Sequence, residues 1–136
     1  MYPKALFINR QTYYFQLING SFGREIGSAR TFGFTREIEM LRKANLAQGG
    51  SLENAIVLTD EGMLNDNPLR FKDEFVRHKI LDIIGDFALL GMPFLGKITA
   101  EKSGHAVHAS LMSKLLKNES AWEIIQANRF QTSSQP

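Results

Sequence analysis

Three ionisable side chains recur at four-residue intervals in one segment of this 136-residue chain: His78, Asp82 and Asp86. On a helix, which turns by about 100° per residue, all three fall on one side. The opposite side is apolar and carries Val76, Ile80, Ile83, Ile84 and Phe87. Helical residues four apart are neighbours, so His78 and Asp82 can present a nitrogen and an oxygen to one point. Zinc accepts both ligand types, and a catalytic zinc takes three protein ligands plus water, so the spacing predicts part of a metal site.

The same spacing also occurs on ordinary solvated helix surfaces, which is the simpler interpretation of a histidine and an aspartate four residues apart. The residues around this pair argue against open solvent, because they include Phe71, Phe75 and Gly85 rather than a run of Lys and Glu. We therefore expect this face to be covered, and we keep both interpretations open at this point.

A second group of candidates follows Lys102, in the stretch Ser103-Gly104-His105-Ala106-Val107-His108. Ser-Gly favours a helix start, which places His105 in a first turn. Asp86 is the candidate carboxylate partner for His105, provided that the two helices pack. A histidine held in this way can act as a general acid or an electrostatic stabiliser. For His108, a surface position beside a capping serine is the simpler interpretation.

Composition limits the classes of function. The chain is 43% hydrophobic and 22% charged, which fits one globular domain. Its net charge of +2 is a small excess without a basic stripe, so binding to nucleic acid has little support. The absence of cysteine excludes disulfides and thiolate metal sites. There is no GxGxxG or Walker A motif, and a nucleotide cofactor is not indicated.

No segment is long and apolar enough to cross a membrane. The longest apolar stretch, residues 87–96, is far short of the required length of about 20 and contains Gly and Pro. The first residues lack the basic and apolar regions of a signal peptide. We therefore expect a cytoplasmic protein.

The residue pattern alternates short strands with helices. Strands are predicted over residues 5–8, 13–18, 28–34, 55–58, 63–65 and 97–100, with turns at 19–20, 48–51 and 60–62. Helices are predicted from Thr35 to a stop at Asn45, from Pro68 to about Leu89, and from Ser103 onward. The last helix should bury Val107, Leu111, Leu115 and Leu116.

Turns of the hairpin type favour an α+β fold: a two-layer sandwich of a small, mainly antiparallel sheet packed on helices. We expect one domain over residues 1–125 and a polar tail over 126–136.

Five segments together resemble a known family. They are residues 28–34 (SARTFGF), 46–51 (LAQGGS), 69–79 (LRFKDEFVRHK), 81–86 (LDIIGD) and 103–105 (SGH). Over roughly residues 10–125 the chain resembles the second, C-terminal domain of the zinc-dependent UDP-3-O-acyl-N-acetylglucosamine deacetylases of lipid A biosynthesis. The resemblance implies one half of a β-α-α-β deacetylase fold.

The resemblance also implies a reaction, in which a zinc-activated water attacks the acetamido carbonyl of the UDP-linked, acylated glucosamine and releases acetate. His78 and Asp82 match two zinc ligands of the family. His105 matches the histidine that stabilises the tetrahedral intermediate and serves the leaving amine, and Asp86 matches its partner. Thr31 matches the hydroxyl that donates to the developing oxyanion.

Six further positions match residues that bind the substrate. Lys79 matches a basic residue near the sugar nucleotide, and Lys102 is expected to assist with phosphate. Four residues fall where the family lines a passage for the acyl chain: Phe32, Phe34, Ile38 and Ala47.

The chain departs from the family pattern in one respect. The family's first domain carries a Glu-His motif that supplies the third zinc ligand and the general base, and no Glu-His pair occurs in this sequence. We therefore expect a C-terminal portion that needs the first domain, or a separate chain bearing it, for activity. A non-catalytic domain that binds sugar nucleotide or acyl chains, and an inactive truncated product, are the alternatives.

Overall fold

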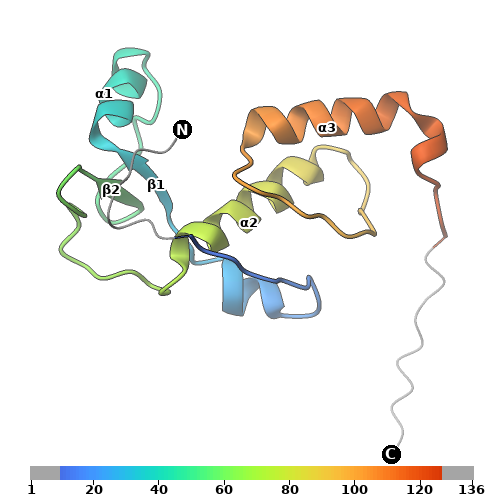
Figure 1. Ribbon diagram of the computed structural model, residues 1–136, viewed down its shortest axis with the longest axis horizontal. Coiled ribbons are helices and arrows are strands. Elements are labelled where there is room, and N and C mark those ends of the chain that lie inside the picture. Colours follow the sequence, from blue (N-terminus) through green and yellow to red (C-terminus); the bar gives the residue numbers. More distant parts are fainter. Residues whose placement is uncertain (1–9, 127–136) are drawn as a thin grey trace, which may run out of the picture.

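The computed structural model describes residues 10–126. In chain order these residues form η1 (Phe22–Ile26), β1 (Thr31–Phe34), α1 (Thr35–Lys43), β2 (Ala55–Leu58), α2 (Glu74–Ala88), α3 (His105–Lys117) and η2 (Glu119–Ala121). The strands and α1 lie at one end of the molecule, α2 crosses its middle, and α3 packs beside α2 (Figure 1). The α+β class is therefore confirmed. None of the helices within residues 10–126 is long and apolar enough to cross a membrane.

The sheet differs from the prediction. Among the described residues it consists of β1 and β2, which pair in parallel from Thr31 with Ala55 to Phe34 with Leu58. The expectation of a mainly antiparallel sheet was wrong because α1 serves as the crossover that a parallel pair requires. The hairpin predicted between residues 55–58 and 63–65 is reduced to an isolated antiparallel bridge between Leu58 and Met63.

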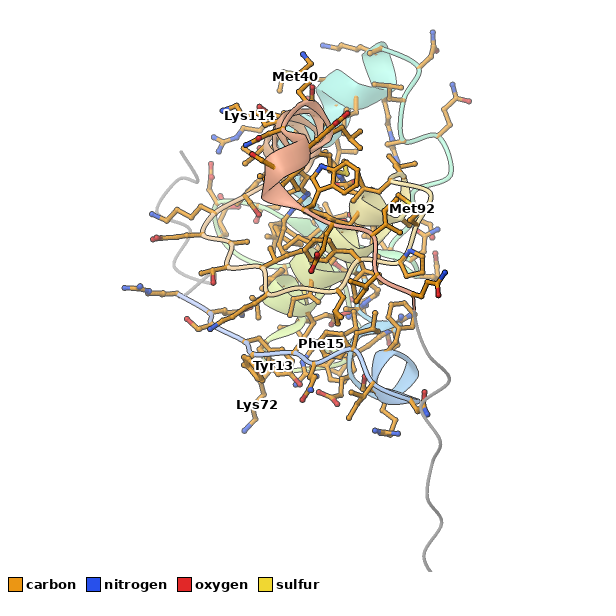
Figure 2. All side chains as sticks on the ribbon, turned by 90° about the vertical axis from the view of Figure 1, so that its right-hand side faces the viewer. Tyr13, Phe15, Met40, Lys72, Met92 and Lys114 are labelled. Atoms are coloured by element: carbon orange, nitrogen blue, oxygen red, sulfur yellow. The ribbon has the colours of Figure 1, made fainter. Side chains whose placement is uncertain are left out.

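Two other predicted strands are not strands in the structure. Residues 13–18 and 97–100 join no ladder within residues 10–126, and the strand predicted over residues 5–8 lies outside the described part of the chain. Side chains hold the first of these segments instead. The Tyr13 hydroxyl donates to Glu25 Oε2 at 2.6 Å, and the Arg77 guanidinium lies 4.1 Å from the centre of the Tyr13 ring. Tyr13 and Phe15 are labelled in Figure 2, where Met40 and Lys72 reach outward at opposite ends of the view.

The start of α1 agrees with the prediction, and the start of α2 does not. Helix α1 starts at Thr35, and Asn45 follows its end with the left-handed φ of 57° that the sequence predicted. Helix α2 begins at Glu74 rather than near Pro68. The residues between form a loop around the Glu74 carboxylate, to which the Arg70 backbone N–H donates at 2.6 Å. This contact explains the later start.

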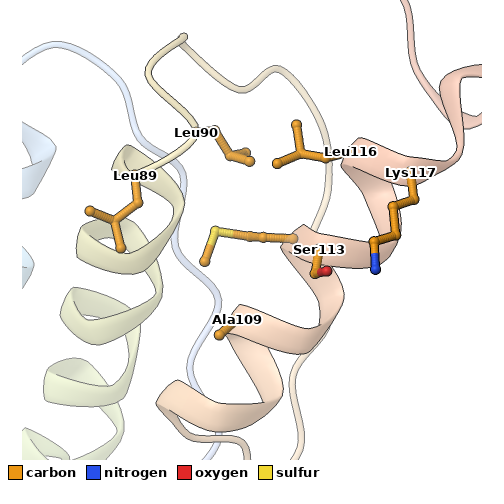
Figure 3. A pocket seen from close by; sticks show the side chains of 7 residues that line it. Leu89, Leu90, Ala109, Ser113, Leu116 and Lys117 are labelled. Carbon is orange, nitrogen blue, oxygen red and sulfur yellow. The ribbon is translucent and has the colours of Figure 1, made fainter.

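Helix α3 buries a different face from the one predicted. His108 and Met112 are its buried residues, whereas Val107, Leu111 and Leu116 are exposed. The prediction from apolar spacing was wrong because α3 packs on α2 through the stripe that begins with His108. Near the ends of α2 and α3 this packing leaves a shallow groove lined by Leu89, Leu90, Met112 and Leu116 (Figure 3). None of these residues belongs to the predicted site.

The hydrophobic core joins the sheet to α2. Phe34, Ile56, Leu58 and Phe75 are buried together, and the edge of the Phe32 ring packs on Phe75 with ring centres 4.9 Å apart. The Asn65 side chain satisfies backbone groups at the edge of β2 that faces away from β1. Its Oδ1 accepts from Val57 N–H, and its Nδ2 donates to the carbonyls of Leu52 and Ala55. The core and this amide clamp fix β1 and β2 against the first turn of α2.

A buried ion pair locks the start of β1 to the start of α2. The Glu74 side chain is 0% exposed and that of Arg30 is 4% exposed. Glu74 Oε1 accepts from Arg30 N and Nε at 2.9 and 3.0 Å, and Oε2 accepts from Arg30 Nη2 at 3.1 Å and from Arg70 N at 2.6 Å. Four donors thus compensate for the removal of one carboxylate from water.

Replacing Glu74→Gln should destabilise the chain by about 3–5 kcal/mol, because it leaves the Arg30 guanidinium buried without a counter-charge. Urea denaturation followed by circular dichroism measures this change. Glu39→Gln on the exposed side of α1 is the matched control and should change stability by less than about 0.5 kcal/mol.

The pH dependence of this difference has a defined sign. Burial raises the pKa of Glu74, but the hydrogen bonds from Arg30 and Arg70 outweigh burial and lower it. The stabilisation is therefore complete above the unfolded Glu pKa of about 4.3 and is lost as the pH falls through the folded value. A difference between the native chain and Glu74→Gln that grew on acidification would contradict this assignment.

Candidate metal centre and histidine relay

His78 lies in the second turn of α2 with its two ring nitrogens in different roles. Nδ1 is 3.2 Å from the carbonyl oxygen of Ala29, which only accepts, so Nδ1 carries the proton. Nε2 lies 3.1 Å from Asp82 Oδ1, to which it donates when the ring is protonated and beside which it presents a lone pair when the ring is neutral. A backbone carbonyl on one nitrogen is the usual device that orients a metal-bound histidine and fixes its tautomer.

The pair of His78 Nε2 and Asp82 Oδ1 fits a zinc ion. Two acceptor atoms 3.1 Å apart repel each other unless a proton or a cation lies between them. Ligands with zinc bonds of about 2.0–2.2 Å lie roughly 3.3–3.6 Å apart at the tetrahedral angle, so this pair needs little adjustment. The side chains are 12% and 9% exposed, and the face is therefore covered, as the neighbouring aromatic residues suggested.

Asp82 is held in its ionised form. Burial raises its pKa, but hydrogen bonds from His78 and Lys79 and the charges of both residues lower it from 3.8 to about 2. Lys79 Nζ lies 3.0 Å from Oδ2, which leaves Oδ1 to face His78. Lys79 also lies 5.4 Å from the centre of the Phe32 ring, a cation–π contact that steadies the ammonium.

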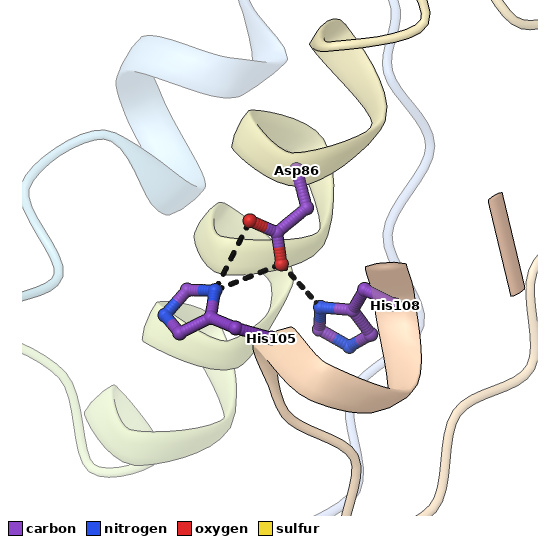
Figure 4. A group of neighbouring side chains, drawn as sticks. All are labelled: Asp86, His105 and His108. Atoms are coloured by element: carbon purple, nitrogen blue, oxygen red, sulfur yellow. Dashed lines mark hydrogen bonds and ion pairs between the residues drawn. The ribbon is translucent and has the colours of Figure 1, made fainter. Parts of the chain in front are cut away.

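Asp86, one turn farther along α2, accepts hydrogen bonds from two histidines of α3 (Figure 4). His105 Nδ1 lies 2.8 Å from Oδ2 and 3.0 Å from Oδ1, and His108 Nδ1 lies 2.6 Å from Oδ2. Burial raises the pKa of Asp86, and the hydrogen bonds from His108 and His105 lower it overall. The predicted packing of His105 on Asp86 is present in the structure.

These three residues could also hold a metal ion, since one ligand atom from each lies within 4.8 Å of the others. However, every short contact in this group pairs an N–H donor with a carboxylate, so protons alone satisfy it. The His78–Asp82 pair differs because the Nδ1 proton of His78 is directed at the Ala29 carbonyl, which leaves Nε2 as the nitrogen that can face a cation shared with Asp82 Oδ1. His105 Nε2, the other ring nitrogen of that residue, lies 4.0 Å from Asp82 Oδ1 and so faces the pair.

The sequence was compared with those of known proteins. The family model described as "LpxC: UDP-3-O-acyl N-acetylglycosamine deacetylase" matches residues 1–117. The chain belongs to this family. It is 50% identical over 122 residues to the UDP-3-O-acyl-N-acetylglucosamine deacetylase of Myxococcus xanthus (strain DK1622). That alignment covers 90% of this chain and 39% of the relative, so the chain spans about two fifths of the relative's length.

Thr31 and the residues that resemble the family's substrate-binding positions are only partly brought together. Thr31 begins β1 and is exposed, and Phe32 lies beside His78 with ring centres 6.3 Å apart. Phe34 belongs to the buried core. Ile38 is half-buried in α1. Two others are exposed loop residues with left-handed backbones, Ala47 (φ 54°) and Lys102 (φ 48°).

Sequence reasoning missed three residues that shape this site and misplaced a fourth. Arg30 and Glu74 are 44 residues apart, and no local spacing indicates their pairing. The carbonyl of Ala29 is a backbone group and does not appear in any side-chain pattern. The interpretation of His108 as a surface residue was wrong, because its side chain is 5% exposed. Its place three residues after His105, on the same helix face, could have indicated this.

Removing the Lys79 ammonium tests the electrostatics of Asp82. Lys79→Met should raise the pKa of Asp82 while leaving it below 3.8, because His78 remains in contact. Carboxyl ¹³C NMR across an acid titration measures the shift. Lys43→Met, at the exposed end of α1, should leave the Asp82 titration unchanged, and equal curves for native and Lys79→Met chains would contradict the assignment.

Proposed function

We propose that this chain supplies part of the active site of a zinc-dependent deacetylase that acts on UDP-3-O-acyl-N-acetylglucosamine in lipid A biosynthesis. The observation that carries the proposal is the distance of 3.1 Å between His78 Nε2 and Asp82 Oδ1, with His78 Nδ1 directed at the Ala29 carbonyl. Family membership supports the reaction type.

In this proposal His78 and Asp82 are the zinc ligands. When bound, the zinc polarises the acetamido carbonyl and activates a water molecule. His105 stands beside the pair with Nε2 facing it, and its Nδ1–H donates to Asp86. A protonated His105 can stabilise negative charge on the reacting amide and deliver a proton to the leaving amine. The exposed Thr31 hydroxyl is the candidate donor to the developing oxyanion.

The substrate assignments follow from the resemblance and are supported unequally by position. Lys79 lies next to the metal pair and already forms an ion pair with Asp82. Its ammonium would therefore bind a sugar-nucleotide oxygen and the Asp82 carboxylate at the same time. Phe32 lies beside His78 and Lys79 and can contact the substrate's apolar part. Ile38, Ala47 and Lys102 are accessible enough to do so, whereas Phe34 can shape an acyl passage only from within the core.

The third zinc ligand and the general base are proposed to come from another polypeptide segment. The chain has three histidines. His78 serves the pair, and His105 and His108 are engaged with Asp86. Two ligands are fewer than a catalytic zinc requires. The complete site would therefore form when a first-domain segment bearing a Glu-His motif packs against α2.

Zinc titration by calorimetry tests the ligand assignment. The native chain should bind one zinc ion, and both His78→Ala and Asp82→Asn should weaken binding at least about tenfold, because each leaves a single ligand. His108→Asn should keep the affinity within about threefold. If His108→Asn abolished binding and His78→Ala did not, the zinc would belong to the Asp86 group and the proposal would fail.

The chain alone should release no acetate from UDP-3-O-acyl-N-acetylglucosamine above the rate of the zinc-containing buffer, because within residues 10–126 no base and no third ligand accompany the pair. Acetate release measured over hours checks this outcome. Hydrolysis by the purified chain that disappears in His78→Ala would refute it. Binding of the substrate without hydrolysis would agree with it.

A further inference from the structure

His108 is buried in the contact between α2 and α3, and both of its ring nitrogens have partners. Its side chain is 5% exposed. Nδ1 lies 2.6 Å from Asp86 Oδ2, and Nε2 lies 2.8 Å from Ser103 Oγ. A carboxylate only accepts, so Nδ1 donates to it, and the serine hydroxyl then donates to Nε2. The ring is therefore held in one orientation and one tautomer.

His105 is in the opposite situation. It donates to the same oxygen of Asp86 at 2.8 Å, but its side chain is 70% exposed. Water competes for an exposed hydrogen bond, and an exposed side chain can change rotamer readily. His105 therefore depends for its orientation on a carboxylate that is itself held still.

We propose that His108 is a positioning residue: its buried ring fixes the Asp86 carboxylate in the orientation that accepts the His105 Nδ1–H and so directs His105 Nε2 toward the His78–Asp82 pair. The order runs from the half-buried Ser103 through the buried His108 to Asp86 and then to the exposed His105. This inference rests on the proposed function, in which His105 serves the reacting amide.

Packing alone does not account for a histidine at this position. Met112, one turn along α3, is also buried and lines a groove with Leu89 and Leu90, which directly follow α2. An imidazole in place of an aliphatic side chain costs desolvation of two polar atoms, which is compensated only when both have partners. Ser103 and Asp86 are those partners, and the hydrogen bond to an ionised group is of the stronger kind.

The test is the tautomer of His105, read by long-range ¹H–¹⁵N NMR of the histidine rings on the zinc-free full chain, above the ordinary histidine pKa of about 6.5. The native chain should show His105 as the Nδ1–H tautomer. His108→Leu should abolish this preference and give a mixture dominated by Nε2–H, as in free histidine. His108→Asn should restore the preference, because its amide nitrogen stands where Nδ1 stood and can donate to Asp86.

Met112→Ala is the matched control, since it loosens the same helix contact without touching Asp86, and it should leave His105 as Nδ1–H. If His108→Leu does not fold, His108→Met, which also lacks a donor, replaces it. That variant keeps an apolar side chain of similar size in the helix contact and should likewise reduce the Nδ1–H fraction of His105. An unchanged His105 tautomer in the folded donor-free variant would overturn the proposal, as would equal losses in Met112→Ala and in the donor-free variant.

This experiment is separable from the test of the proposed function because no zinc is present. If His78→Ala left zinc binding intact, the function proposed above would fail while the tautomer result stood. If the His105 tautomer ignored His108, the positioning role would fail while the zinc assignment stood.

Discussion

The ionised carboxylate of Glu74, removed from water, requires hydrogen-bond donors from more than one part of the chain. Arg30 supplies three and the Arg70 backbone supplies the fourth. Breaking such a pair is far more costly than never having formed it, so the segments that supply the donors cannot move independently. The ion pair also positions the site. Ala29 directly precedes Arg30, and His78 is one helical turn beyond Glu74, so the Ala29 carbonyl lies against His78 Nδ1. The ion pair therefore determines which nitrogen of His78 is left for a metal.

Two imidazole–carboxylate groups lie one turn apart on α2, yet their hydrogen atoms give them different uses. At His78 the Nδ1 proton is directed at a carbonyl, and Nε2 faces the oxygen of Asp82. At Asp86 the Nδ1 protons of two histidines point at the carboxylate. A cation between Nε2 and Oδ1 in the first arrangement leaves the Nδ1 proton in place, whereas a cation in the second would displace the Nδ1 protons of both histidines. Counting potential ligands would favour the three residues around Asp86, but the positions of the protons favour the two at His78 and Asp82.

The sequence sufficed where the evidence was local. The helical spacing of His78, Asp82 and Asp86, the left-handed stop at Asn45 and the helix start after Gly104 follow from neighbouring residues, and all three appear in the structure. The parallel pairing of β1 with β2 could not be predicted locally, because it depends on how α1 crosses between them. The late start of α2 and the buried face of α3 were also missed. In each case a polar contact overrode the expected pattern: the bond from the Arg70 N–H to Glu74 at the start of α2, and the bond between His108 and Asp86 where α3 packs on α2.

Glu74, the His78–Asp82 pair and Asp86 are progressively less buried along α2, and this order suits the role proposed for each group. Glu74, which holds the fold, is fully buried. His78 and Asp82 are about nine-tenths buried, which strengthens their attraction for a cation while leaving one side open. His105, bound to Asp86, is mostly exposed. A group that exchanges protons with a substrate must be reachable, and reachability weakens its own hydrogen bonds. An exposed histidine can therefore keep a defined orientation only if a buried neighbour such as His108 fixes the carboxylate to which it donates.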